Sequence, residues 1–156
     1  MTTAYDVPAG QLVSALTAKL MQLDSIKAAD WTKFAKTGRH REKAPMDSEW
    51  WHKRVASVLR KVYILGPVGT SRLAAEYGGA SDRGSKPNRA VKGSGSATRM
   101  ALQQLEKAGL VQQQKSRGRV VSGKGRSLVD DTAFEVFQTV AKSEPSMEKY
   151  KSKAKK

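Results

Sequence analysis

Hydrophobic residues recur along the N-terminal part of the chain at the spacing of an amphipathic helix. A helix is predicted over residues 9–23, where leucines follow one another every third or fourth position: Leu12, Leu16, Leu20 and Leu23. A shorter helix is predicted over residues 31–36, with Asp30 placed to cap it and Gly38 to end it. These two segments would form a helical pair in front of the rest of the domain.

The clearest helical pattern covers residues 48–65, between a capping residue at Asp47 or Ser48 and a stop at Gly66-Pro67. At the angular spacing of a helix, the apolar side chains share one face: Trp51, Val55, Val58, Leu59 and Val62. Basic side chains fall on the opposite face: Lys53, Arg54, Arg60 and Lys61. This helix is therefore expected to combine a core face with a basic stripe.

The second half of the chain has the order of elements of a winged helix-turn-helix motif. Thr70 is placed to cap a short helix, and Ser96 a longer one that ends before Gly109. Between them, residues 79–95 are rich in Gly, Ser and basic residues and predict an exposed loop. The remaining pattern predicts a β-hairpin and a last helix, with strands over 110–115 and 119–122 and the helix from Lys124 or Leu128 to Ala141.

The predicted fold class is mainly α: a winged helix-turn-helix with a small β-hairpin wing and an extra N-terminal helical pair. One domain is expected over residues 1–141, with the basic loop 79–95 inserted before the recognition helix. Residues 142–156 are rich in lysine and poor in apolar side chains, which predicts a flexible tail.

Charge indicates the class of ligand. The 156 residues include 29 Lys and Arg against 14 Asp and Glu, a formal net charge of +15. Acids and bases balance over residues 1–35, so the excess lies in clusters further along, which is typical of a nucleic-acid-binding protein. The residues predicted to bind nucleic acid are Arg39, Arg41, Lys43, Lys53, Arg54, Arg60, Lys61, Arg83, Lys86, Arg89, Lys92, Arg99, Lys115, Arg117, Arg119, Lys124 and Arg126.

Other classes of function find little support. The chain has no cysteine, which excludes disulfides and thiolate chemistry. Residues 118–125 nearly spell a phosphate-binding loop, but Gly125 stands where a hydroxyl is required. Glu49 and His52 are too common a pair to indicate a metal site. We expect no enzyme, no cofactor, no bound metal and no membrane span, in a protein of the cytoplasm.

The mode of nucleic-acid binding is suggested by the aromatic residues. Residues 79–99 and 115–126 contain none, so a platform that stacks single-stranded bases is not expected there. Basic side chains on a Gly-rich backbone suit phosphates and groove shape. Trp50 falls near Lys53 and Arg54 and could stack on a base, but packing under the preceding helical pair is the favoured interpretation.

Two stretches, APMDSEWWHKRVASVLRKVYILGPVGTSRLAAEYGG at 44–79 and KGSGSATRMALQQLEKAGLV at 92–111, resemble the archaeal/eukaryotic-type small-subunit ribosomal protein family nineteen. The wording QQLEKAGLV is closer to archaeal members. The resemblance implies a winged-helix protein in the head of the small ribosomal subunit that binds ribosomal RNA. It also implies that the main basic determinants are Arg54, Arg60 and Arg99. The chain departs from the family at Ala80 and after Pro87.

The function predicted from residues and resemblance together is that of a structural constituent of the small ribosomal subunit. It would bind ribosomal RNA through phosphate contacts and support maturation of the RNA and assembly of the subunit. The expected partners are small-subunit ribosomal RNA and neighbouring ribosomal proteins, with the protein itself a monomer. The alternative is a winged-helix transcription factor, which would dimerise and read duplex DNA.

Overall fold

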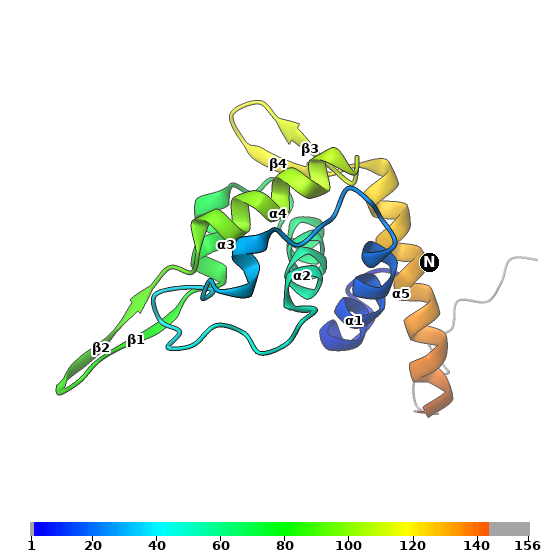
Figure 1. The fold of residues 1–156 in the computed structure, drawn as a ribbon. Coiled ribbons are helices and arrows are strands. Elements are labelled where there is room, and N and C mark those ends of the chain that lie inside the picture. Colours follow the sequence, from blue (N-terminus) through cyan, green and yellow to red (C-terminus); the bar gives the residue numbers. More distant parts are fainter. Residues whose placement is uncertain (1, 144–156) are drawn as a thin grey trace, which may run out of the picture.

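The long helix predicted over residues 48–65 forms the centre of the molecule (Figure 1). The computed structural model describes residues 2–143, so the predicted tail lies outside them from residue 144 onward. The elements in chain order are α1 (Ala9–Met21), η1 (Asp30–Lys33), α2 (Trp50–Leu65), α3 (Thr70–Glu76), β1 (Gly79–Arg83), β2 (Lys86–Val91), α4 (Gly95–Lys107), β3 (Val111–Gln114), β4 (Gly118–Val121) and α5 (Gly123–Ser143).

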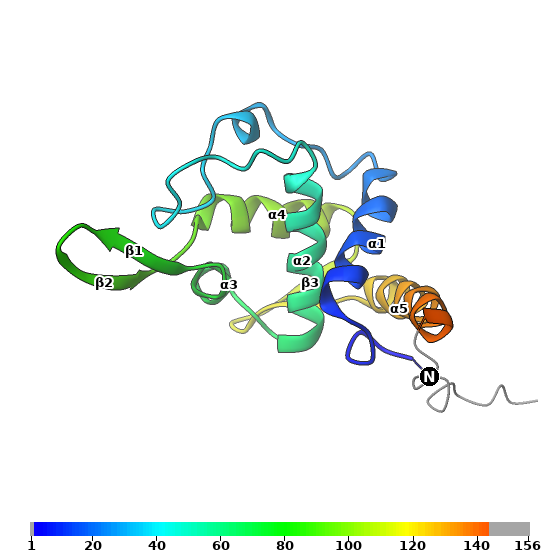
Figure 2. The ribbon, with the colours of Figure 1, turned by 90° about the horizontal axis from the view of Figure 1, so that it is seen from below.

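The core surrounds α2, whose predicted apolar face is fully buried. Helix α1 packs on one side of α2 and α4 on another, and α5 covers α1 (Figures 1 and 2). The Trp51 indole donates a 3.0 Å hydrogen bond to Gln104 Oε1, and Gln104 Nε2 donates at 2.7 Å to the Lys27 carbonyl. This chain of hydrogen bonds fixes α2, α4 and the segment after α1 relative to one another.

The winged helix-turn-helix is confirmed. Helices α2, α3 and α4 form the helical part, and β3 pairs with β4 in an antiparallel wing. Val68, between α2 and α3, exchanges two backbone hydrogen bonds of 3.0 Å with Arg119 of β4. The wing is thereby attached to the helical part by backbone, so its tip is held in a defined position.

The prediction that residues 79–95 form a loop is wrong. Most of this segment is a second antiparallel hairpin, β1–β2, which projects from the body at the end opposite α5 (Figures 1 and 2). Its two faces are both largely exposed, so the sequence lacks the apolar-polar alternation that predicts a strand. Gly84 makes the turn with φ +67°, and its N–H donates at 2.9 Å to Asp82 Oδ1.

Backbone packing anchors the base of the β1–β2 hairpin. A Cβ atom on Gly93 would lie 2.5 Å from the Tyr77 carbonyl oxygen, and one on Gly78 would overlap the Val91 carbonyl oxygen. Only glycine permits the two backbone segments to approach this closely where the hairpin connects to α3 and to α4. The hairpin is therefore joined to the body by closely packed backbone.

Several predicted boundaries are also wrong. The second member of the N-terminal pair is a 3-10 turn, η1, and Asp30 lies inside it instead of capping it. Ser94 caps α4 by accepting a 3.2 Å hydrogen bond from the Ala97 N–H, so the helix begins before Ser96. Thr70 is the first residue of α3 instead of its cap. The last helix continues past Ala141, into the first residues of the predicted tail.

Candidate nucleic-acid interface

The basic stripe predicted on α2 is present, but two of its four charges are paired within the chain. Lys53 Nζ lies 2.6 Å from Asp47 Oδ2, and Lys61 Nζ lies 2.8 Å from Glu76 Oε2. These hydrogen bonds lower the pKa of each carboxyl group below its ordinary value. The charges of Lys53 and Lys61 are therefore already balanced by carboxylates within the chain.

Arg54 has a different environment, because no carboxylate among residues 2–143 lies within ion-pair distance of it. Its guanidinium lies over the Tyr77 ring, 4.1 Å from the centroid, and the Tyr77 hydroxyl lies 2.8 Å from Ser57 Oγ. Burial lowers the pKa of Arg54, Tyr77 partly offsets that effect, and Arg41 nearby lowers the pKa further, although an arginine stays charged at neutral pH. The Arg54 charge is therefore partly desolvated and uncompensated.

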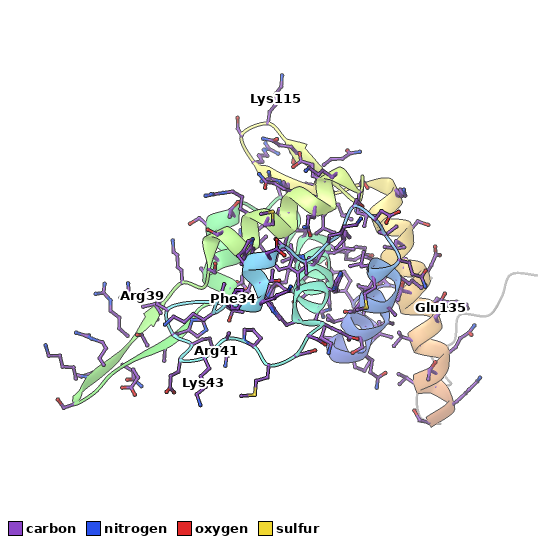
Figure 3. The ribbon with its side chains drawn as sticks, in the orientation of Figure 1. Phe34, Arg39, Arg41, Lys43, Lys115 and Glu135 are labelled. Carbon is purple, nitrogen blue, oxygen red and sulfur yellow. The ribbon has the colours of Figure 1, made fainter. Side chains whose placement is uncertain are left out.

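Three predicted residues follow one another on the loop between η1 and α2. Arg39, Arg41 and Lys43 are exposed and lie on the side of the molecule from which the β1–β2 hairpin projects (Figure 3). Arg41 and Lys43 line a cavity of about 480 Å³ together with Lys53 and Arg54. Asp47 is the one acid in that lining. The structure thus brings the loop and the start of α2 together around a positively charged hollow.

The β1–β2 hairpin extends this basic surface. Arg83 and Lys86 face each other across the strands near the tip, and both are exposed. Like charges directly opposite one another repel, so this pair is unfavourable in the free protein. Arg39 from the loop lies beside Arg89 and Lys92 of the hairpin, where they share a smaller hollow of about 370 Å³. We call the loop, the start of α2 and the hairpin the loop–hairpin face.

The wing residues form a separate group. Lys115 lies at the tip of the β3–β4 turn, away from the loop–hairpin face (Figure 3), and Arg117 beside it is exposed. Arg119 is half-buried and its Nε donates at 3.2 Å to Glu106, so it anchors the wing to α4. Other predicted residues are exposed on α4 and at the start of α5, namely Arg99, Lys124 and Arg126.

Trp50 is a packing residue, as the favoured interpretation predicted. Its indole N–H donates at 3.2 Å to the Thr32 carbonyl, and its ring meets those of Trp31 and Trp51 edge to face. One edge of Trp50 remains in the lining of the 480 Å³ cavity. Arg60 is also partly buried, and its Nε has no hydrogen-bond partner in the described part of the chain.

Sequence reasoning missed the partners of these basic residues. Two of these partners lie at the end of α3: the Tyr77 ring lies under Arg54, and Glu76 pairs with Lys61. They are separated from the α2 residues along the sequence and contact them only because the fold brings the end of α3 beside α2. It also missed Phe34, which is 83% exposed beside the basic loop (Figure 3). Helical spacing identifies neighbours on one helix, so contacts between α2 and α3 left no signal in the sequence.

The segment that resembles a phosphate-binding loop and the residue His52 have structural explanations. Gly118–Val121 is strand β4 and Gly123 already begins α5, so this segment forms no phosphate-binding loop. His52 Nε2 lies 3.4 Å from the Ile26 carbonyl. Within residues 2–143, no three His, Cys, Asp or Glu side chains gather as they would around a metal ion. Nor does any helix in that range have the length and apolar character to cross a membrane.

Comparison with known proteins decides the family. The family model described as "Ribosomal protein S19e" matches residues 3–139. The chain belongs to the ribosomal protein S19e family. The small ribosomal subunit protein eS19 of Haloarcula marismortui is 46% identical over 155 residues, covering 96% of this chain and 99% of that protein.

Further relatives agree. The eS19 of Aeropyrum pernix is 43% identical and covers 96% of this chain and 99% of its own length. The eS19B of Schizosaccharomyces pombe is 35% identical over 85% of this chain and 93% of its own length. The archaeal relatives match more closely than the eukaryotic one, as the wording of the sequence predicted. Membership of the S19e family confirms a ribosomal protein that is not an enzyme, and these relatives give no support to a transcription factor.

Proposed function

We propose that this S19e protein is a structural constituent of the small ribosomal subunit that binds ribosomal RNA through phosphate contacts. The observation that carries the proposal is the loop–hairpin face, where Arg41, Arg54, Arg83 and Lys86 present positive charge with few acids beside them. Such a surface repels itself in the free protein and is neutralised by a polyanion. The relatives are named as small ribosomal subunit proteins, which supports ribosomal RNA as that polyanion.

Binding would draw its free energy chiefly from counterion release. Each phosphate that a basic side chain neutralises frees condensed cations, which gives an affinity that falls steeply with salt. The exposed arginines of the loop and the hairpin would bind directly. Lys53 and Lys61 would contribute less, because each leaves a carboxylate within its own chain. The wing would add a second, separate contact through Lys115 and Arg117.

The rest of the molecule would hold these contacts in a fixed relation during assembly. Residues 1–35, whose charges balance, and the core carry the basic elements, so the protein would join distant strands of RNA while they fold. Phe34 and Met46, which are 83% and 93% exposed, are suited to contacts with neighbouring ribosomal proteins. The protein would act as a monomer in cytoplasmic ribosomes and support maturation of the small-subunit RNA.

Sedimentation of the tagged protein from its own cells tests the proposal. The protein is expected to comigrate with the small subunit and to remain there after a moderate salt wash. The double charge reversal Arg39→Glu/Arg41→Glu is expected to shift it to the top of the gradient, and Arg54→Glu and Arg60→Glu to weaken the association. Lys27→Glu, on an exposed residue outside the basic face, is the matched control and is expected to sediment normally. Wild-type protein found only at the top of the gradient would disprove the proposal.

A further inference from the structure

The cavity between the loop, α2 and the end of α3 has features that a phosphate contact alone does not require. Resting on the proposed function, we propose that it receives a single RNA nucleotide turned out of its helix. The phosphate would lie between Arg41 and Arg54, and the base would stack on the outer face of the Arg54 guanidinium. This goes beyond phosphate neutralisation, because it assigns the protein a contact with one unpaired base.

The first support is the state of the Arg54 guanidinium. Its central carbon lies 4.1 Å from the centroid of the Tyr77 ring, and the Tyr77 hydroxyl lies 2.8 Å from Ser57 Oγ, while Lys61 Nζ lies 4.9 Å from the centroid of the same ring. Its donors meet no carboxylate in the part of the chain described. Five N–H donors and a planar face are thus positioned before any ligand arrives. Splayed bases in RNA are recognised by stacking on such guanidinium planes.

The second support is the balance of charge around the cavity. Arg41, Lys43, Lys53 and Arg54 line it, and Asp47 alone opposes them. Asp47 is already paired with Lys53 at 2.6 Å, and the other three cations form no ion pair with a carboxylate among residues 2–143. Arg41 lies close enough to Arg54 to lower its pKa. A phosphate placed between the two arginines removes this repulsion.

The third support is the size and chemistry of the walls. The cavity measures about 480 Å³, within the range of roughly 300–1,000 Å³ of small-molecule sites, and it is open to solvent. Ala44, Pro45 and Trp50 add an apolar wall to the same lining. A phosphate group alone leaves most of this space empty and gains nothing from that wall. A base fills it and covers the apolar surface.

The absence of cysteine in the chain allows a direct test in the assembled subunit. Ala44→Cys places a single thiol in the cavity lining, where a tethered iron chelate generates hydroxyl radicals that cut nearby RNA. We expect one short set of cuts centred on a bulged or loop nucleotide of the small-subunit RNA. Lys115→Cys at the wing tip is the matched control and is expected to cut elsewhere.

The outcomes separate this inference from the proposed function. Incorporation of Ala44→Cys with cuts confined to continuous duplex would overturn the nucleotide site and leave the rRNA-binding role intact. Incorporation with no cuts in RNA, and a crosslink to a protein instead, would show that an acidic protein segment fills the cavity and would also overturn it. Failure of wild-type protein to join the subunit would contradict the proposed function itself.

A second measurement uses the whole protein and small probes. The Trp50 indole signal in NMR reports binding of adenosine 5′-monophosphate and of inorganic phosphate at the cavity. Arg54→Lys keeps the charge and loses the planar face, so it is expected to weaken the mononucleotide about tenfold and inorganic phosphate less than about twofold. Arg72→Lys, on an exposed arginine of α3 outside the cavity lining, is the matched control and is expected to change both by less than about twofold. Equal effects of Arg54→Lys on the two probes would show an anion site without a base and would overturn the inference.

Discussion

The β1–β2 hairpin offers a perturbation whose effect on binding can be worked from its charges. The triple substitution Arg83→Gln/Lys86→Gln/Arg89→Gln removes three exposed cations and no buried side chain. Each phosphate contact contributes about 0.7 to 0.9 to the slope of log affinity against log salt concentration. If all three residues contact phosphates, the slope of log affinity against log salt concentration becomes shallower by about 2 to 3. At about 0.15 M salt, this change corresponds to an affinity for ribosomal RNA about 100-fold lower.

The assay is retention of small-subunit ribosomal RNA by the protein on a filter, repeated from 0.1 to about 0.5 M potassium salt. The difference between variant and wild type should shrink as salt rises, because the loss is electrostatic. Thermal unfolding measured in parallel should give a midpoint that is unchanged or slightly higher, since Arg83 and Lys86 repel each other across the strands. An unchanged salt slope would refute the assignment of the hairpin to RNA. A midpoint lowered by several degrees would refute the view that the hairpin is separate from the core.

Further predictions concern the basic stripe, the hairpin base and the core. Glu76→Gln releases Lys61 and is expected to tighten RNA binding and steepen its salt slope in the same filter assay. Gln22→Glu, at the residue that follows α1, is expected to change neither. The Lys61 hydrogen bond lowers the pKa of Glu76 from its ordinary 4.5, so its stabilisation is complete above that pH and is lost as the pH falls below it. The difference in melting temperature between wild type and Glu76→Gln should therefore shrink as the pH falls through the lowered pKa of Glu76. Gly93→Ala drives a Cβ atom into the Tyr77 carbonyl and should reduce RNA binding and melting temperature together, whereas Gly10→Ala, with open space around it, should affect neither. Leu59→Ala should lower the free energy of unfolding by about 2–5 kcal/mol, measured by urea denaturation.

Periodicity predicted the parts of the fold in which one face is buried. Val55, Val58 and Leu59 repeat at helical spacing because they meet the core, and the structure buries all three. The wing was also predicted, because glycine and a basic turn separate two short strands. The β1–β2 hairpin was missed for the converse reason: both of its faces meet solvent, so no pattern marks its strands.

The sequence predicted which basic residues lie in the candidate site, but not which side chains of other segments they contact. Helical geometry places Lys53, Arg54 and Lys61 on the outer side of α2, and they do lie there. Their states differ because Asp47 and Glu76 approach from other segments, and Tyr77 supplies the ring beneath Arg54. Such contacts depend on the angle between helices, which a single sequence does not reveal.

The crowding of like charge on the loop–hairpin face has a consequence for the lifetime of the protein in the cell. Arg41 beside Arg54, and Arg83 opposite Lys86, raise the free energy of the folded chain whenever RNA is absent. A ligand that binds only the folded state adds stability by mass action, about 2.7 kcal/mol when it is present at 100 times its dissociation constant. If the protein binds ribosomal RNA as proposed, copies made in excess of that RNA would unfold most often and meet proteases first. The side chains proposed to attach the protein to RNA would thus couple its abundance to the supply of that RNA.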